Sequence, residues 1–429
     1  MLKAVARDSL ARNSVLIMAS TVGTAGLGYL YWMIAARELP QPAIGAATAL
    51  ISVATVVSMV SNLGIGHMFI QRLPAADPAG WSRIVSGGLL AGCTSTAVAS
   101  FVAVAVLPAV AGNFAFLGSE GGALALIATA VALTASTLLD HVFVAHRASH
   151  GMLWRNLGVA GGKVVTLGVL TWAGVGGAAA VLLAWTLPSL TVTAYTLVVS
   201  LTRLRPGARL RVAGIGGELG HVRGALTGHH LINLAQAGPS ALLPVLVTAR
   251  LGAEANGHFY VAWMTASVLF MVSPAVASAM YAERTNKAGA SLPRAALVVL
   301  VVIGLPALVL FTCGGPILAL FSPGYAAEGE LLLRILVLAA IPDAITNLAV
   351  AHWRSLGEYR RCLRLNLLMA VICLALTWLW LPGTGIEGAG IAWLTGQCAG
   401  AVAVAVHAFW RKVENPAPVQ PVRADHRRA

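Results

Sequence analysis

Long apolar runs, each close to the length that crosses a lipid bilayer, follow one another along almost the whole chain. A helix needs about 20 apolar residues to span the hydrocarbon core. Because backbone groups in lipid must be satisfied internally, runs of this length predict helices. Twelve such runs with short connections predict an all-α integral membrane protein with 12 transmembrane helices. They lie near residues 13–36, 43–70, 84–107, 122–146, 156–173, 177–201, 224–249, 256–281, 295–313, 331–352, 364–381 and 387–410.

The composition agrees with a membrane protein and argues against a nucleic-acid partner. The chain is 58% hydrophobic and 10% charged, whereas about 25% of the residues in a soluble domain are charged. A net charge of +13 indicates nucleic-acid binding only when it forms a basic face or domain. Here the basic residues stand in short junctions between apolar runs, so we predict no nucleic-acid partner.

The residue types that hold metals and cofactors do not cluster in the sequence. The cysteines are odd in number, and no CxxC, Cys/His or HExxH spacing occurs. Scattered cysteines inside apolar segments are typical of small buried side chains. We therefore predict no metal, no cofactor and no catalytic residue. The cysteines are Cys93, Cys313, Cys362, Cys373 and Cys398.

Basic residues alternate between connections, which predicts the orientation of the chain. The N-terminus and every second connection carry nearly all of them, while the other connections carry Glu120, Glu254, Glu328, Glu330 and Glu387. Lys and Arg are retained on the cytoplasmic side of membrane proteins. We therefore expect both termini in the cytoplasm. Ala, Gly, Val and Arg are all frequent, as in GC-rich bacterial genomes, so we expect a bacterial cytoplasmic membrane.

The two halves of the chain repeat one another. Val144–Arg155 returns as Val350–Arg361 with Val, Ala, His, Ser, Gly and Arg at one offset, and Leu39–Arg72 returns as Leu251–Arg284. Gly174–Ala178 likewise resembles Gly385–Ala389. Six spans separate the matching segments, so both copies have the same orientation. This predicts a parallel repeat of two six-helix bundles related by an axis along the membrane normal.

The repeat sets the expected organisation of the chain. Residues 1–12 form a cytoplasmic N-terminus and 13–201 the first bundle. Residues 202–223 form a cytoplasmic linker, 224–410 the second bundle and 411–429 a basic, disordered tail. Arg423, Arg427 and Arg428 in that tail are expected to contact anionic membrane lipids. His146 and His352 fall at cytoplasmic helix ends, where a cation meets the helix dipole favourably. We interpret these repeated corners as hinges or anchors.

Several short motifs resemble one family of transporters. Asn62–Gly66 running to Arg72 resembles the end of the second helix of polysaccharide flippases, and Ala35–Arg37 followed by Ile44-Gly45 resembles their first outer turn. Gly385–Ala389 and Phe321–Tyr325 resemble their later turns. These proteins are the oligosaccharide branch of the multidrug/oligosaccharidyl-lipid/polysaccharide (MOP) exporter superfamily. The resemblance implies a MATE-like fold and alternating access.

Two acids lie well inside predicted spans, and both are candidates for the transport cavity. Asp140 and Asp343 are two to three turns from the cytoplasmic ends of the fourth and tenth spans, about one turn out of register under the repeat. A charge at that depth costs on the order of 2.5–3.5 kcal/mol, so it faces a wet interior or a partner. They either couple a cation (H⁺ or Na⁺) or contact a sugar hydroxyl, or they pair with a neighbouring Arg, His or hydroxyl.

The seventh span carries a polar stripe. His229, Asn233 and Gln236 follow an i, i+4, i+7 spacing that places them on one helix face. A wet cavity or hydrogen bonding between helices explains such a stripe. Pro239 and Pro244 in this span remove backbone hydrogen bonds, as Pro342 does beside Asp343.

Intramembrane basic groups are candidates for binding a lipid phosphate. Lys163, the deepest lysine, either faces the cavity or reaches back to the cytoplasmic surface. Arg37 and Arg250 occupy matched outer ends, where they either receive a phosphate or anchor the helices. Arg334 has no counterpart in the first half, and His141 is a further candidate.

The leading hypothesis from the sequence is a flippase for a polyprenyl-(pyro)phosphate-linked oligosaccharide, moved to the outer leaflet for cell-surface polysaccharide synthesis. The alternative is a cation-coupled multidrug or metabolite exporter of the same superfamily, whose members generally carry an acid in the first helix; none occurs here. We predict no enzymatic activity, because no outer loop is long enough to hold a catalytic site. The expected partners are the lipid-linked oligosaccharide, membrane lipids and a coupling cation.

Overall fold

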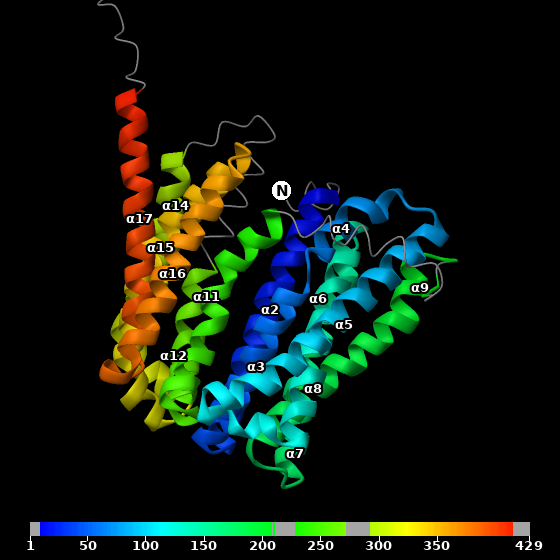
Figure 1. Cartoon of the computed structure of the whole chain (residues 1–429), viewed down its shortest axis with the longest axis horizontal. Helices are drawn as coiled ribbons and strands as arrows, with labels where there is room; N and C mark the ends of the chain where they lie inside the picture. Colours follow the sequence, from blue (N-terminus) through cyan, green and yellow to red (C-terminus); the bar gives the residue numbers. More distant parts are fainter. Residues whose placement is uncertain (1–8, 208, 211–227, 272–291, 415–429) are drawn as a thin grey trace, which may run out of the picture.

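The structure, a computed structural model, consists of helices joined by short connections (Figure 1). It describes residues 9–207, 209–210, 228–271 and 292–414, and no strand occurs within these ranges. Six long helices form the N-terminal half: α2 (Ser9–Glu38), α3 (Gln41–Ser61), α5 (Pro78–Val110), α6 (Glu120–Ala145), α7 (Ser149–Trp172) and α8 (Gly177–Tyr195). Six more form the C-terminal half: α11 (Gly228–Leu251), α12 (Ala253–Phe270), α14 (Leu292–Ala319), α15 (Pro323–Ser355), α16 (Tyr359–Thr384) and α17 (Glu387–Glu414).

These helices coincide with the twelve predicted spans. Within the described ranges, eight of them are long and apolar enough to cross a membrane by length and composition alone. The remaining four, α2, α7, α12 and α14, pack among the others. Short elements complete the chain: α4 (Ile65–Arg72), η1 (Leu73–Ala75), η2 (Gly112–Gly118), the π-helix η3 (Thr196–Ser200) and α9 (Leu201–Leu204).

Some of the sequence predictions fall outside the described residues. These are most of the linker at 202–223, the end of the 256–281 span, and the tail from 415 onward with Arg423, Arg427 and Arg428. The His229 side chain and the repeat partner Arg284 also lie outside what the structure describes.

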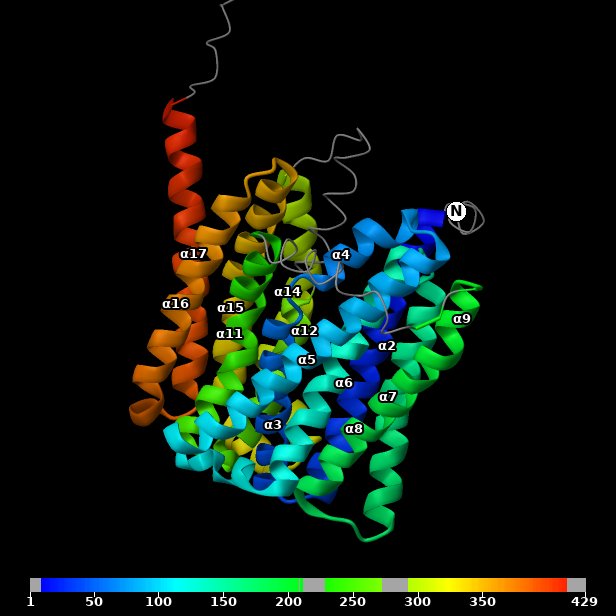
Figure 2. The same cartoon turned by 45° about the vertical axis from the view of Figure 1, so that its right-hand side comes forward.

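The start of α2 and the end of α17 lie at the same end of the bundle (Figures 1 and 2). We call this end the basic side, because the connections there carry the exposed residues Arg147, Arg203 and Arg360. The opposite end, which we call the far side, holds the turns from α2 to α3 and from α11 to α12. The even number of long helices explains why both described ends share one side.

The two halves cross at a pair of glycines that are equivalent in the repeat. A Cβ added to Gly45 of α3 would overlap the carbonyl oxygen of Ala253 and lie 3.1 Å from the nitrogen of Gly257. A Cβ on Gly257 would in turn lie 3.1 Å from the carbonyl oxygen of Gln41. Each half therefore presents the same segment to the other, as expected for two bundles around a shared axis.

Further contacts join the halves at the far side. Arg37 donates to the Leu320 carbonyl at 2.8 Å, and Asn113 donates to the Ala249 carbonyl at 3.2 Å. Tyr29 of α2 lies edge-on to Phe321, with ring centroids 4.9 Å apart. These contacts close the far side of the molecule.

On the basic side, α3 ends at a sharp break. Leu63 and Gly64 both adopt left-handed backbone conformations, with φ of 51° and 72°. Glycine takes this conformation without a steric penalty, which accounts for Gly64 in the motif Asn62–Gly66. The break starts the short helix α4, which packs on α6 and α5.

The two repeated corners fold differently, so the expectation of equivalent corners is wrong in detail. In the first, α6 ends at Ala145, His146 is the C-cap residue, and Arg147 turns the chain with φ of 54°. In the second, α15 continues past His352 to Ser355, and the turn comes at Gly357 with φ of 74°. Helix α15 therefore extends further on the basic side than α6 does.

Candidate functional site

The helices that carry Asp140 and Asp343, α6 and α15, start in the same way. Each has a serine N-cap: the Ser119 side chain accepts from the Gly122 amide, and the Ser322 side chain accepts from the Gly324 amide. Counted from these serines, Asp140 and Asp343 occupy the same position. The sequence prediction places them one turn out of register because it aligns the corners, where α15 is longer. Each acid therefore lies the same number of residues from its helix cap.

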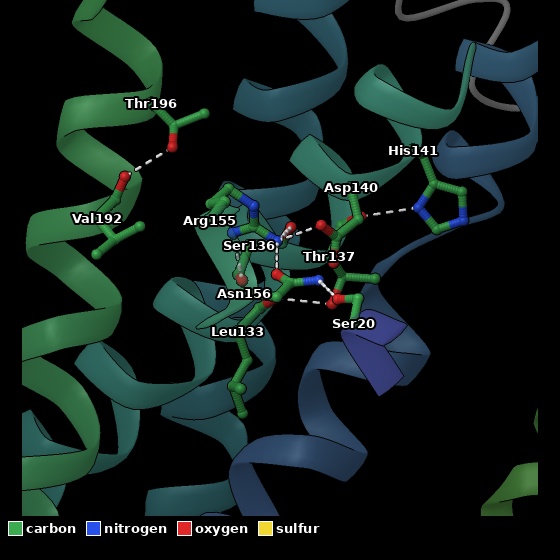
Figure 3. Close-up of polar contacts among 10 residues, drawn as sticks. All are labelled: Ser20, Leu133, Ser136, Thr137, Asp140, His141, Arg155, Asn156, Val192 and Thr196. Atoms are coloured by element: carbon green, nitrogen blue, oxygen red, sulfur yellow. Dashed lines mark hydrogen bonds and ion pairs between the residues drawn. The ribbon is translucent and has the colours of Figure 1, made fainter. Parts of the chain in front are cut away.

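Asp140 forms a buried ion pair with Arg155 of α7 (Figure 3). The Arg155 side chain is 3% exposed, and it also donates to the Ser136 hydroxyl at 2.8 Å and to the Asn156 amide oxygen at 2.8 Å. Asn156 reaches the Ser20 hydroxyl of α2 at 3.4 Å. Of the two interpretations left open by the sequence, Asp140 thus has the arginine partner.

Asp343 lies in a cavity of about 320 Å³ inside the C-terminal half, between α11, α12, α15, α16 and α17. The residue is 6% exposed and accepts a hydrogen bond from Asn347 at 3.0 Å. The cavity wall is polar on one side, with Gln236, Thr346, Asn366 and Gln397. A volume of this size falls within the range of small-molecule sites.

The starts of α7 and α16 differ at the arginine that pairs with Asp140, when the two helices are aligned by their first residues rather than by the corner repeat. The start of α7 reads Leu153-Trp154-Arg155-Asn156, and the start of α16 reads Leu363-Arg364-Leu365-Asn366. Under this alignment, Leu365 takes the position of Arg155, the residue that pairs with Asp140. Asn366 takes the position of Asn156. Leu365 is buried, so the C-terminal half has no guanidinium at this place.

A second cavity, of about 300 Å³, lies between the two halves on the basic side. Its walls combine histidines with amides and hydroxyls, and the described residues that line it include no carboxylate. The N-terminal half contributes Thr55, Ser58, Asn62, His67, Thr137 and His141, and α11 contributes His230 and Asn233. His67 and His141 face one another with ring centroids 6.3 Å apart. We call this space the interbundle cavity and the one around Asp343 the C-half cavity.

Hydrogen-bonded side chains lead from Asp343 toward the interbundle cavity. Asn347 donates to Asp343 and accepts from Gln236 at 3.2 Å. Gln236 in turn accepts from the Arg354 guanidinium at 3.0 Å. An arginine that the sequence predicts to be only a membrane anchor therefore reaches into the bundle.

The polar chain continues from Arg354 to Asn233, and Asn233 connects the halves. Arg354 donates to the Asn233 amide oxygen at 3.4 Å, and the Asn233 nitrogen lies 3.3 Å from the His67 ring nitrogen of the N-terminal half. Asn233 and Gln236 thus share a face of α11, as their spacing predicts. The two cavities are linked by one polar chain.

The other predicted basic candidates lie outside the two cavities. The Lys163 ammonium lies 3.1 Å from the centroid of the Trp185 ring, so it is held within the half rather than extended to the basic surface. Arg250 packs over the Trp378 ring at 4.6 Å, and Arg334 pairs with Glu330 at 2.6 Å. Arg37 bridges the halves through the Leu320 carbonyl. None of these four lines the interbundle cavity or the C-half cavity.

Sequence reasoning misses the arginine and most amides of the site. Asn347, Asn366 and Gln397 lie in predicted spans, and intramembrane amides of this kind are a signal that the acids overshadow. Arg354 and Arg155 both stand near corners, where a basic residue predicts a surface anchor. The alignment of Arg155 with Leu365 is visible in the sequence, although its meaning depends on which acid each residue faces.

No protein-family model matches the chain, and no curated protein matches it. Solved structures do match over nearly its whole length. An inward-facing multidrug resistance MATE family transporter of the MOP superfamily is 16% identical, with a TM-score of 0.67 over 91% of this chain and 94% of the other. The outward-facing conformation of such a transporter is 16% identical, with a TM-score of 0.59 over 95% and 96%. A MATE structure in the straight conformation gives a TM-score of 0.54 at 16% identity, over 95% and 96%.

This likeness shows the fold. The chain has the architecture of MATE transporters of the MOP superfamily, with two bundles of six helices. The predicted fold class is confirmed.

Proposed function

We propose that this chain, which has the fold of MATE transporters, moves a lipid-linked oligosaccharide from the cytoplasmic to the outer leaflet by alternating access. The observation that carries the proposal is the chemistry of the interbundle cavity. It presents His67, His141, His230 and amides, with Arg354 beside them and no carboxylate among its described lining residues. Such a wall suits a phosphate and sugar hydroxyls, whereas an organic cation is better held by carboxylates or by the faces of aromatic rings.

The arrangement of the halves supports the direction of transport. Gly45 and Gly257 close the far side, and the interbundle cavity lies toward the basic side. Because basic connections are retained in the cytoplasm, we take this to be the cytoplasm-facing state. The substrate would enter the interbundle cavity there, and rocking of the bundles would release it on the far side.

A second candidate function is export of a drug or metabolite driven by a cation. The observation that favours it is Asp343, a buried carboxylate in a cavity and linked to the other half through Arg354. Under the flippase proposal the same residue is the place for a coupling cation, H⁺ or Na⁺.

The two functions are separated by reconstitution of the full-length protein into liposomes. The probe is a polyprenyl-diphosphate oligosaccharide with a fluorophore on its sugar, present in both leaflets and quenched from outside by dithionite. A flippase raises the quenchable fraction above the outer-leaflet share, and empty liposomes do not. An unchanged fraction together with uptake of ethidium in the same liposomes would instead establish the exporter.

A further inference from the structure

The C-half cavity has two donor groups without a partner. Asn366 is 1% exposed and Trp393 is 7% exposed, and both line this cavity. Within the described part of the chain, neither the Asn366 amide nitrogen nor the Trp393 indole nitrogen has a hydrogen-bond partner. A buried donor without an acceptor is destabilising, so these two groups favour a ligand that brings acceptor oxygens.

Aromatic rings form one wall of the cavity. The rings of Trp263 and Trp393 meet edge to face with centroids 5.0 Å apart, and Phe270 lies 5.7 Å from Trp393. An aromatic wall of this kind packs against an apolar face, such as the C–H face of a puckered sugar ring. A hydrated metal ion has no such face.

The remaining wall offers acceptors and a negative charge. The Asp343 carboxyl group lines the cavity, and the described lining residues include no other acidic or basic side chain. Carboxylate oxygens accept hydrogen bonds from hydroxyl groups. The same charge repels an acidic ligand, because a second carboxylate in this buried space would be strongly disfavoured.

We infer that the C-half cavity binds one pyranose ring of the substrate, and that this ring is not an acidic sugar. Hydroxyl oxygens meet the nitrogens of Asn366 and Trp393, hydroxyl hydrogens meet Asp343, and the C–H face of the ring lies on the aromatic wall. The inference rests on the proposed function, which it deepens by naming the sugar-recognition site. Arg354 and the interbundle cavity then hold the phosphate end.

The test uses the full-length protein in lipid nanodiscs and saturation-transfer difference NMR. The probes are the methyl glycosides of glucose, galactose and N-acetylglucosamine, with methyl glucuronide as the acidic comparison. At least one neutral glycoside is expected to bind saturably, and the glucuronide to bind at least about fivefold more weakly.

Two variants locate the binding, and one serves as a control. Asn366→Leu and Trp393→Phe each remove a donor, and the second keeps an aromatic ring, so each should weaken the neutral glycoside about fivefold. Trp172→Phe changes a residue that is 89% exposed and should leave binding unchanged. A cooperative thermal unfolding transition shows that a variant is folded. If only one of the two variants is folded, its binding alone tests the inference.

The outcomes separate this inference from the proposed function. Absence of saturable binding by any neutral glycoside, binding that both variants leave unchanged, or equal binding of the glucuronide would overturn the inference. If the dithionite assay still shows flipping in that case, the proposed function stands. Glycoside binding with the expected pattern but without flipping would overturn the proposed function and leave the sugar site in place.

Discussion

Asp140 and Asp343 occupy the same position in equivalent helices and have opposite surroundings. Asp140 is paired with a guanidinium that is 3% exposed, and the pair is tied to α2 through Asn156. Asp343 lines a cavity of about 320 Å³, with Leu365 in the place of the arginine. One copy of the repeat therefore uses its acid to hold helices together, and the other leaves space beside it. The two halves thus place equivalent acids in different surroundings.

The largest effect is expected from Arg155→Ala, which breaks the ion pair with Asp140 in the N-terminal half. The substitution leaves a carboxylate in the bundle without its cation, and breaking such a pair costs about 3 kcal/mol when one partner is partly exposed, as Asp140 is at 26%. The free energy of unfolding in detergent, measured by denaturant titration, should fall by that amount. A double variant, Asp140→Asn with Arg155→Leu, removes both charges and should recover most of the loss. Equal instability of the double variant would contradict a role for the ion pair.

The next largest effect concerns transport rather than stability. Asp343→Asn keeps the shape of the side chain and removes its charge, so flipping in the dithionite assay should slow about tenfold, equivalent to about 1.4 kcal/mol. The free energy of unfolding should change by less than about 1 kcal/mol. The matched control is Asp140→Asn, which strands the buried Arg155 and should lower stability more than Asp343→Asn does. If the two substitutions destabilise the protein equally, the two acids do not differ in role.

The first corner contains a contact whose contribution to stability depends on pH. Burial and the nearby charge of Arg205 hold the pKa of His146 below its usual value, and its ring nitrogen accepts from Trp81 at 2.7 Å. A lowered folded-state pKa means that the unfolded chain binds the proton more readily. The stabilisation is therefore present above about pH 6.5 and is lost as the pH falls. The melting temperature should drop on acidification, and it should drop less in His146→Gln, which still accepts from Trp81. An unchanged pH dependence would exclude His146 as its source.

The smallest effect is expected from Arg361→Ala. This residue matches Arg155 in the corner repeat, but it pairs with Glu358 and its side chain is 38% exposed. Exposed ion pairs contribute about 0.2–1 kcal/mol, so the free energy of unfolding should change by no more than about 0.5 kcal/mol. A loss comparable to that of Arg155→Ala would show that the two corners are energetically alike after all.

The fold could be predicted from the sequence because it depends on properties summed over many residues. Runs of about 20 apolar side chains identify the spans even when the exact ends of a helix are uncertain. Matching glycines such as Gly45 and Gly257 identify the repeat. The predicted start of the tenth span, at 331, is later than the start of α15 at Pro323, because Pro323–Glu330 is polar and its serine cap outweighs hydropathy.

The site depends on individual pairs, and these could not be predicted. Whether Asp140 meets Arg155 depends on the turn between α6 and α7, where Arg147 takes a left-handed conformation that the sequence does not indicate. The length of α15 past His352 likewise determines that Arg354 lies beside Gln236 and Asn233. A shift of one helical turn at either corner would give different partners.

The contact of Gly45 with Ala253 and Gly257 joins the two halves through backbone atoms. Main-chain atoms have no rotamers, so this contact cannot soften by small side-chain adjustments. The two backbones are therefore either in contact or apart. This contact lies where matching segments of the two halves meet, which is close to the axis about which the halves would rotate. A small separation there therefore corresponds to a much larger displacement of the helix ends on the basic side.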